Sequence, residues 1–245
     1  MSIKLQDLLY NKKDLTKIKE FEDISLENIT IEDLTFNGKN YNEFINLNSF
    51  LSQVSSCQIS DAFNEIANRS GVLYNLKSIN NLKAWGKITT VKTNSDDWGT
   101  ITLAIDEADD GDVLLVDTGD MDAAIWGELA STCAKNSGVK ATLVYGCVRD
   151  LDALLYMDYP IFACGFRPNA GNAFGFGKIN VDLVLESMEI SAGDFLYGDE
   201  TGVVIIPKEL FTQVMNKTFE IKLKEKKITD MLNSGMSLSQ VVGLK

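Results

Sequence analysis

A chain of 245 residues with 45% hydrophobic and 24% charged residues has the size and composition of an ordinary globular protein. Its net charge of -12 disfavours nonspecific binding to nucleic acid, which depends on neutralising phosphates, so we expect no nucleic-acid partner. The sequence has no apolar run long enough to cross a membrane and no apolar core of a secretion signal near its start, so we expect no membrane partner either.

The chain contains no histidine, which removes much of the catalytic and metal-binding chemistry that proteins use near neutral pH. Ser-His-Asp and Cys-His mechanisms are excluded, and so are zinc or iron sites with histidine ligands. Carboxylate, lysine, tyrosine, cysteine and arginine chemistry remains, with or without a hard cation such as Mg²⁺ or Mn²⁺ held by oxygen atoms. The four cysteines lack CxxC spacing, which predicts reduced thiols in a cytoplasmic protein.

Residues 1–50 are more polar than the rest of the chain and contain an Asn37-Gly38 turn signal. We expect a short helix and then a hairpin, which together form an amino-terminal extension. The main domain then comprises residues 51–245 and begins with a helix over residues 58–68, where apolar residues recur at helical spacing.

The middle of the chain alternates between predicted strands and helices. Residues 84–93 predict a strand, and residues 100–108 are ambiguous between strand and helix. Two apolar runs, 112–119 and 139–150, are typical of buried strands that end in polar residues. Between them, residues 123–138 predict a helix that is closed by a glycine.

The last third of the chain predicts a short helix, a strand, an irregular loop, several turn-linked strands and a long polar helix. In order, these elements cover residues 151–157, 159–165, 166–180, 184–207 and 208–232. Strand-helix-strand units in the middle and turn-linked strands near the end predict an α/β domain. Its core would be a mixed β-sheet or barrel flanked by helices, with an extra amino-terminal segment.

The two buried strands and the helix between them predict a ligand site. If the strands are parallel neighbours, their carboxyl ends and the amino terminus of the helix meet at the sheet edge where α/β proteins usually bind ligands. The start of the helix offers free backbone N–H groups to an anion. Gly127 would allow that backbone to approach a ligand closely.

Arg149 and Asp150 follow the second of these strands directly. An arginine fork suits a carboxylate bound through two hydrogen bonds, and an aspartate suits a hard cation. Together they could hold a 2-oxo acid. Considered alone, however, the two residues favour a surface ion pair at a strand end.

The wider pattern changes that balance. The segment from Trp126 to Asp150 resembles the signature of the RraA-like family, which includes 4-hydroxy-4-methyl-2-oxoglutarate aldolases. That signature is an acidic residue, twenty residues of any type and then Arg-Asp, which Glu128 and Arg149-Asp150 match, although the usual acid is aspartate. Further matching segments are SDAF (60–63), AWGKITTV (84–91), DDGDVLLVD (109–117), YPIFACG (159–165), AGDFLYGDETGVVIIP (192–207) and KEKKI (224–228).

The resemblance implies an activity and a role for three side chains. It implies the swivelling β/β/α type of fold and a metal-dependent pyruvate aldolase that cleaves 4-hydroxy-2-oxo acids. Decarboxylation of oxaloacetate is expected as well, because it forms the same enolate. Asp150 would bind Mg²⁺ or Mn²⁺, Arg149 would bind the pyruvate unit of the small 2-oxo acid substrate, and Glu128 would hold a water on the metal.

The resemblance also implies contributions from the backbone and from a second subunit. Backbone N–H groups around Gly127, Leu129 and Ala130 would complete the carboxylate site. Glu225, on the carboxyl-terminal helix, would reach the site of a neighbouring subunit in a homotrimer or homohexamer.

Two other functions are compatible with such a sequence. One branch of the family consists of trimeric regulators that bind a partner protein such as a ribonuclease, without catalysis; the intact set of Glu128, Arg149 and Asp150 favours the enzyme. A methyltransferase of menaquinone synthesis is disfavoured because no glycine-rich nucleotide loop follows the first predicted strands.

Overall fold

The computed structural model of this protein describes the backbone of residues 41–244, with side chains from residue 47 onward. The hairpin expected around Asn37-Gly38 and the helix expected before it therefore lie outside the described residues. Helix α2 (Tyr41–Gln53) runs across the expected boundary between residues 50 and 51. Its Phe50 and Leu51 are fully buried, so this helix belongs to the packed domain.

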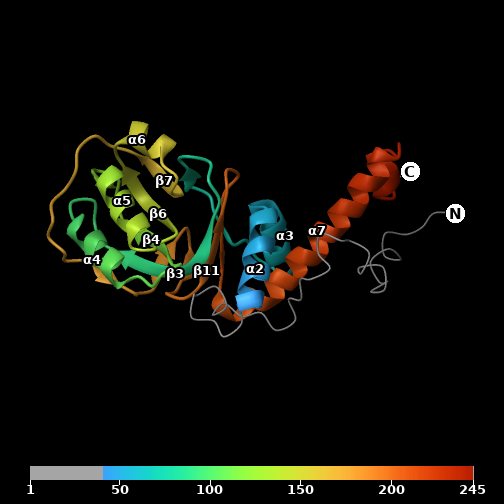
Figure 1. Ribbon diagram of the computed structural model, residues 1–245, viewed down its shortest axis with the longest axis horizontal. Helices are drawn as coiled ribbons and strands as arrows, with labels where there is room; N and C mark the ends of the chain where they lie inside the picture. The colour runs from blue at the N-terminus through green and yellow to red at the C-terminus, as the bar shows by residue number, and fades with distance from the viewer. Residues whose placement is uncertain (1–40, 245) are drawn as a thin grey trace.

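A mixed sheet of ten strands forms the centre of the domain (Figure 1). Strand β3 (Ala84–Lys92) joins its two halves, because its first residues pair with one neighbour and its last residues with another. On the antiparallel side, β3 pairs with β11 (Phe195–Gly198), which pairs in turn with β12 (Val203–Ile206) and then β1 (Val72–Leu73). This half contains the turn-linked strands expected near the end of the chain.

The other half of the sheet is mainly parallel. Strands β3, β4 (Val113–Asp117), β6 (Ala141–Val148) and β7 (Ile161–Phe166) run side by side in the same direction. Strand β2 (Lys77–Ser78) closes this edge by pairing antiparallel with β7. Because β1 and β2 lie at opposite ends of the strand order but only a few residues apart in the chain, the sheet curls toward a barrel. The expected mixed sheet flanked by helices is confirmed.

Short strands and turns complete the sheet region. Strand β5 (Ala124–Trp126) pairs with the end of β6, and β8 (Lys178–Ile179) pairs antiparallel with the end of β3. Strands β9 (Leu183–Leu185) and β10 (Met188–Ile190) form a separate hairpin. The prediction of a helix over the whole of 123–138 was wrong at its start, because β5 pairs its backbone with β6 before the helix begins.

Helices cover the two halves of the sheet separately. Helices α4 (Gly99–Glu107), α5 (Glu128–Asn136) and α6 (Leu151–Tyr156) lie on the parallel half, and the ambiguous segment 100–108 is thus helical. Helix α3 (Ser56–Ala67) and the first part of α7 (Phe211–Asn233) pack with α2 on the antiparallel half. A short 3-10 helix, η4, precedes α7, and α8 follows it; their bounds are Lys208–Leu210 and Leu238–Val241.

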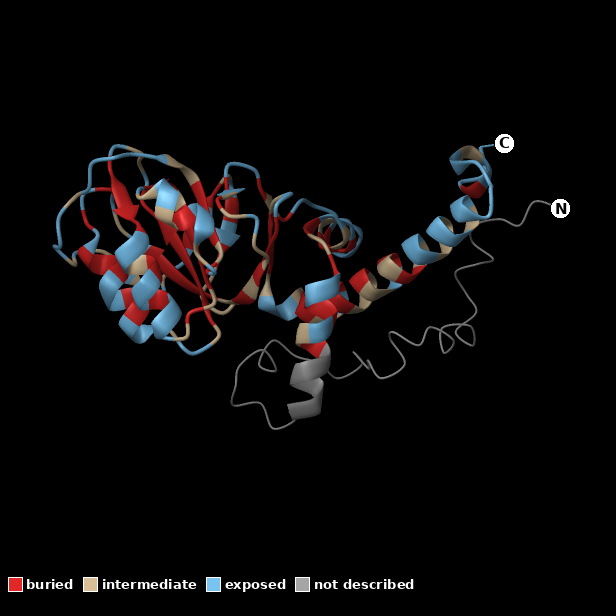
Figure 2. Cartoon of the chain, turned by 45° about the horizontal axis from the view of Figure 1, so that its top comes forward, coloured by how far each residue is buried: buried red, intermediate tan, exposed pale blue. Residues whose placement is uncertain are grey.

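Three apolar clusters hold these layers together, as the buried strands in Figure 2 indicate. One lies between the antiparallel half and α2, α3 and α7 and includes Phe63 and Phe211. A second lies between the parallel half and α4 to α6 and includes Trp126. The third fills the inside of the curled sheet, with Leu115 and Leu143 among its members. The outer half of α7 extends beyond these clusters and is largely exposed (Figure 2).

One buried carboxylate holds the 174–176 part of the long segment between β7 and β8. Both oxygens of Asp97, which is 1% exposed, accept hydrogen bonds from the backbone of the 174–176 segment, at 2.7 to 3.1 Å. Thr100 donates a further hydrogen bond at 2.8 Å, and Gly99 donates its N–H at 3.0 Å. Burial acts to raise the pKa of Asp97, but these donors outweigh it and lower the pKa to about 2.

This carboxylate makes a testable contribution to stability. Because its pKa is lowered, its contribution is complete above the ordinary value of 3.8 and is lost as the pH falls toward about 2. We expect Asp97→Asn to lower the free energy of unfolding by about 2 kcal/mol at pH 7, measured by urea unfolding. The variant should also lose less stability than the parent between these two pH values. Asp106→Asn, on the exposed side of α4, is the matched control; equal acid sensitivity of parent and Asp97→Asn would contradict this account.

Candidate functional site

The predicted site lies at the carboxyl-terminal edge of the parallel half. Strands β4 and β6 are parallel neighbours, which is the condition on which the predicted site depended, and β5 continues along β6 beyond the end of β4. Helix α5 then begins at Glu128, with Gly127 as its extended amino-terminal cap. The N–H of Arg149 donates to the carbonyl of Trp126 at 2.9 Å, which places the start of α5 beside the end of β6.

Asp150 turns its carboxylate back toward the start of α5. Its backbone is left-handed, with φ 57° and ψ 40°, a conformation that is uncommon for residues other than glycine. The N–H of Glu128 donates to Oδ2 of Asp150 at 3.1 Å, and Nε of Arg149 lies 3.3 Å from Oδ1. The side chains of Arg149 and Asp150 are 43% and 34% exposed, so a ligand can reach both. The structure thus brings three of the predicted residues together.

Gly127 is required by this close approach and not by its backbone angles, which any residue can adopt. A Cβ atom at this position would overlap Oδ2 of Asp150 and would lie 3.0 Å from Cγ of Arg149. Both contacts are too short, so a larger residue would displace one side chain or the other. The absence of a side chain at Gly127 is what allows Asp150 to reach the N–H of Glu128.

The first turn of α5 leaves donors for an anion. Within the described part of the chain, the N–H groups of Leu129 and Ala130 make no hydrogen bond, as expected at a helix start. The side chains of Glu128 and Leu129 are exposed, and Ala130 is half-buried against the apolar cluster under the parallel half. A carboxylate placed here would meet free N–H groups and the positive end of the helix dipole.

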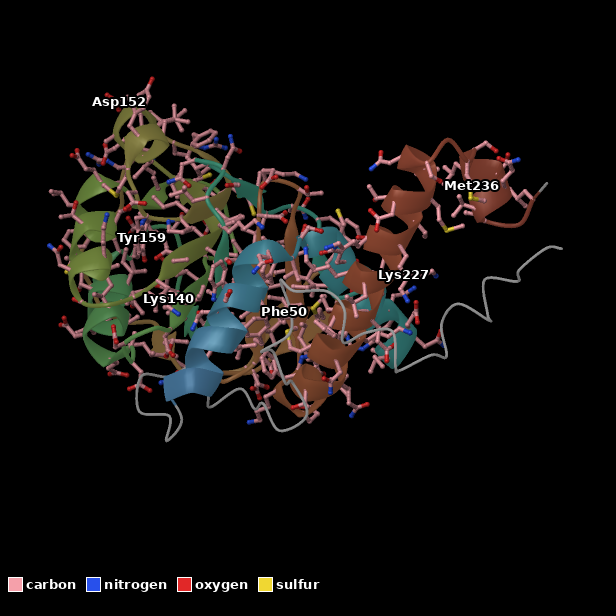
Figure 3. All side chains as sticks on the ribbon, turned by 45° about the vertical axis from the view of Figure 1, so that its right-hand side comes forward. Phe50, Lys140, Asp152, Tyr159, Lys227 and Met236 are labelled. Carbon is pink, nitrogen blue, oxygen red and sulfur yellow. The ribbon has the colours of Figure 1, made fainter. Side chains whose placement is uncertain are left out.

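Glu225 does not join the other predicted residues within one chain. It lies on α7 and accepts a hydrogen bond from Nε2 of Gln58 on α3. Figure 3 shows Asp152, near the start of α6, and Lys227, near Glu225 on α7, at opposite sides of the molecule, and Figure 1 agrees. A role for Glu225 at the site would therefore require a second copy of the chain.

The donor set for a metal ion is small. In residues 47–244, no group of three or more Cys, Asp or Glu side chains is arranged around a common point. The side chain of Asp150 is 34% exposed, and that of Glu128 is exposed as well. Mg²⁺ is often bound by one or two carboxylates, water and the substrate, so a single aspartate fits such an ion.

Two further groups at this edge have structural roles. Nζ of Lys92 lies 2.5 Å from Oδ2 of Asp117, and the N–H of Gly119 donates to Oδ1 of the same residue at 2.8 Å. Both carboxylate oxygens of the aspartate at the end of β4 therefore have partners. Cys147 is completely buried, and burial raises the pKa of its thiol, although Arg167 lowers it. A buried thiol with a raised pKa is a poor nucleophile, so Cys147 serves as a packing residue of β6.

Sequence reasoning missed Arg167 at this edge. It follows β7 as Arg149 follows β6, and its N–H donates to the carbonyl of Val148 at 3.1 Å. A basic residue directly after each of two neighbouring parallel strands was the available signal. The glycines after residue 166 predict an irregular loop, and that expectation hides the signal.

Comparison with known proteins identifies the family of the chain. The family model described as RraA-like, Aldolase/RraA, matches residues 56–205, which is more than half of the chain. An uncharacterized protein of Methanocaldococcus jannaschii is 36% identical over 163 residues, covering 66% of this chain and 78% of that protein. A protein of Halalkalibacterium halodurans, provisionally named 4-hydroxy-4-methyl-2-oxoglutarate aldolase, is 34% identical over 160 residues, covering 65% and 75%. The chain belongs to the RraA-like family.

A solved structure with the same fold carries a different functional name. The RNA-processing inhibitor RraA of Thermus thermophilis superimposes with a TM-score of 0.55 at 24% identity, covering 60% of this chain and 92% of that one. This likeness establishes the fold alone. Family membership supports a lyase at the family level, while the family also contains inhibitors. None of the described helices is long and apolar enough to span a membrane.

The close approach at Gly127 gives a direct test of the site. We expect Gly127→Ala to displace the carboxylate of Asp150 and to destabilise the protein by about 0.5–1.5 kcal/mol, since the hydrogen bond from the N–H of Glu128 is lost. Thermal or urea unfolding measures the change. The control is Gly202→Ala, because a Cβ atom there meets nothing within 4 Å. Equal stability of the two variants would show that the contact around Gly127 is not as tight as described.

Proposed function

We propose that the chain is a divalent-metal-dependent lyase that cleaves 4-hydroxy-2-oxo acids to release pyruvate and also decarboxylates oxaloacetate. The observation that carries the proposal is the left-handed Asp150, whose accessible carboxylate lies between Arg149 and the free N–H groups of α5. This arrangement combines a cation ligand, a carboxylate fork and an anion-binding helix start within one edge of the sheet.

The substrate would bind through its 2-oxo acid end. Its carboxylate would accept hydrogen bonds from the N–H groups of Leu129 and Ala130. The guanidinium of Arg149 bonds Asp150 through Nε, and within the described residues its two terminal nitrogens make no hydrogen bond. Those nitrogens could therefore donate to the substrate carboxylate and to the 2-oxo oxygen. Such donors stabilise negative charge most where it develops in the transition state.

Asp150 is the residue that would hold Mg²⁺ or Mn²⁺, and Glu128, whose backbone N–H bonds Asp150, would orient a water there. When bound, such a cation supplies Lewis-acid stabilisation of the charge that develops on the substrate oxygens. The left-handed backbone of Asp150 supports this role, because it aims the carboxylate away from the start of α6, where it makes no capping bond.

Cleavage of the carbon–carbon bond needs a base that removes the proton of the 4-hydroxyl. The 4-hydroxyl loses a proton, the bond between C3 and C4 breaks to leave a carbonyl at C4, and the electron pair forms the enolate of pyruvate. A proton then returns to C3 to complete pyruvate. Arg149 would stabilise the enolate oxygen, and Glu128 or Glu225 from a second copy would accept the first proton.

Removal of the cation is the first test. We expect pyruvate release from oxaloacetate and from 4-hydroxy-2-oxo acids to stop in EDTA and to return with Mg²⁺ or Mn²⁺. Asp150→Asn should bind the cation far more weakly by calorimetry while remaining folded, since asparagine tolerates the left-handed backbone. Asp152→Asn, an exposed position in the first turn of α6, is the control. Full activity after exhaustive chelation would rule out the metal.

Substitution of Arg149 distinguishes a substrate-binding role for this residue from a simple surface ion pair. Lysine keeps the charge but lacks the planar fork, so a bidentate role would not survive Arg149→Lys. Loss of one charge-assisted hydrogen bond costs about 1.5–3 kcal/mol, so we expect kcat/KM to fall roughly tenfold or more. The melting temperature should not change. Parent-like kcat/KM for every 2-oxo acid that is cleaved would place the substrate elsewhere.

We also propose a trimer or a dimer of trimers in which Glu225 reaches the site of a neighbouring copy. Its distance from Arg149 within one chain and the exposed outer half of α7 support this assembly. Light scattering should give a mass of three or six chains of 27.1 kDa. Glu225→Gln should lower kcat without altering that mass. A monomer in solution would remove Glu225 from the mechanism.

A noncatalytic regulator of a partner protein is the second candidate, since an RNA-processing inhibitor shares this fold. The two functions are distinguished by one measurement. Metal-dependent release of pyruvate from any 4-hydroxy-2-oxo acid establishes the lyase, and its absence across a panel of such acids favours the regulator.

A further inference from the structure

A series of hydrogen bonds joins the buried indole of Trp126 to the backbone at the start of α5. Nε1 of Trp126 donates to Oγ of Ser131 at 2.7 Å, and the same hydroxyl donates to the carbonyl of Gly127 at 2.8 Å. Trp126 is 1% exposed and Ser131 is fully buried, so solvent does not compete for either bond. The hydroxyl therefore has a fixed direction, since it accepts from the indole and donates to the carbonyl.

The carbonyl of Gly127 belongs to the same peptide unit as the N–H of Glu128. This peptide is trans, so its carbonyl and its N–H point in opposite directions. On one side, the carbonyl accepts from Oγ of Ser131 and, at 3.0 Å, from the N–H of Ser131. On the other side, the N–H donates to Oδ2 of Asp150 at 3.1 Å. The donors on the carbonyl therefore set the direction of the N–H that holds the Asp150 carboxylate.

The neighbouring hydroxyl shows why this arrangement differs from an ordinary helical contact. Serine and threonine in helices often bond the carbonyl four residues earlier. Thr132 does so with the carbonyl of Glu128 at 2.9 Å, but Thr132 is exposed. Ser131 is buried and also accepts the indole N–H. Hydrogen bonds in series polarise one another, most of all away from water, so the groups beneath α5 strengthen the bond from Glu128 to Asp150.

We propose that Trp126 and Ser131 are positioning residues for the carboxylate of Asp150, because they fix the peptide unit that binds it. Gly127 caps α5 without a side chain that could hold the first turn, so the indole and the hydroxyl below take that part. Neither side chain touches the substrate or the cation. The inference rests on the proposed function in one respect, that this carboxylate is the one that would hold Mg²⁺ or Mn²⁺.

Amide hydrogen exchange, followed by NMR on the full chain, tests the proposal without a metal ion. We expect Ser131→Ala to speed exchange of the Glu128 N–H roughly three- to tenfold, because its peptide loses a fixed donor. Thr132→Val is the matched control, since it removes an exposed hydroxyl of the same helix that bonds a different peptide, and it should leave that rate unchanged. Trp126→Phe removes the indole N–H and keeps an aromatic ring, so it should act in the same direction by a smaller factor.

Affinity for Mn²⁺ connects this peptide with the proposed site. Titration followed by electron paramagnetic resonance of the free ion gives the Kd at a temperature where every variant is folded. We expect Ser131→Ala to weaken Mn²⁺ binding roughly tenfold, since groups that orient a metal ligand have effects of that size, and Thr132→Val to match the parent. A merely structural role would lower the melting temperature and leave the affinity of the folded protein unchanged.

The indole of Trp126 also reports on the site. With Mg²⁺ added, its N–H resonance should shift in proportion to the fraction of sites filled. Trp85 is the internal control, because its Nε1 bonds Oδ1 of Asn48 on α2 at 2.9 Å and its resonance should not move. A Trp126 resonance that stays in place in a parent saturated with Mg²⁺ would contradict the coupling.

The outcomes separate this inference from the proposed lyase. Parent-like exchange of the Glu128 N–H in Ser131→Ala would overturn the positioning role, and so would parent-like Mn²⁺ affinity where the parent binds the ion. Equal acceleration of exchange at every amide would also overturn it, since that indicates a general loss of stability. If the parent binds no Mn²⁺ but Ser131→Ala still speeds exchange at Glu128 alone, the metal-dependent lyase is overturned and the positioning of Asp150 stands.

Discussion

The site depends on one close approach, the carboxylate of Asp150 against the backbone at the start of α5. The hydrogen bond from the N–H of Glu128 holds this carboxylate, and the missing side chain of Gly127 makes room for it. A left-handed residue outside glycine persists where its surroundings determine it. Here the backbone around Asp150 is held between the paired end of β6 and the start of α5.

That approach is in turn a product of the sheet. The parallel pairing of β4 and β6 brings both strand ends to one edge, and β5 extends the pairing so that α5 begins beside Arg149. The apolar cluster below, which includes Trp126 and Val148, fixes both elements from beneath. The polar residues at the edge are therefore arranged by a core in which they take no part, which is typical of α/β ligand sites.

Charge gives the edge its chemical character. The chain is strongly acidic, yet the edge presents the guanidinium groups of Arg149 and Arg167 and the free N–H groups of α5. Asp117 is paired with Lys92 and Asp120 accepts backbone N–H groups, and within the described residues neither carboxylate forms an ion pair with Arg149 or Arg167. A small anion would find several hydrogen-bond donors close together at this edge.

Local sequence patterns predicted the buried strands β4 and β6 and most of the larger helices, because apolar runs and helical spacing do not depend on which segments later become neighbours. Arg149 and Asp150 were singled out with Glu128 by resemblance to a family signature, since the two residues alone favour a surface ion pair. The absence of histidine likewise restricts the available chemistry whatever fold the chain adopts.

Contacts between distant segments settled what local patterns could not. Whether residues 124–126 continue a helix or pair with β6 depends on a neighbour distant in sequence, and pairing prevailed. The hold of Asp97 on the segment after β7 likewise joins residues far apart in the chain. Only the register of β6 and β7 places Arg167 beside Arg149, and only the packing of α7 on α3 separates Glu225 from both. These side chains meet or part through strand pairing and core packing, and no single segment of sequence encodes either of them.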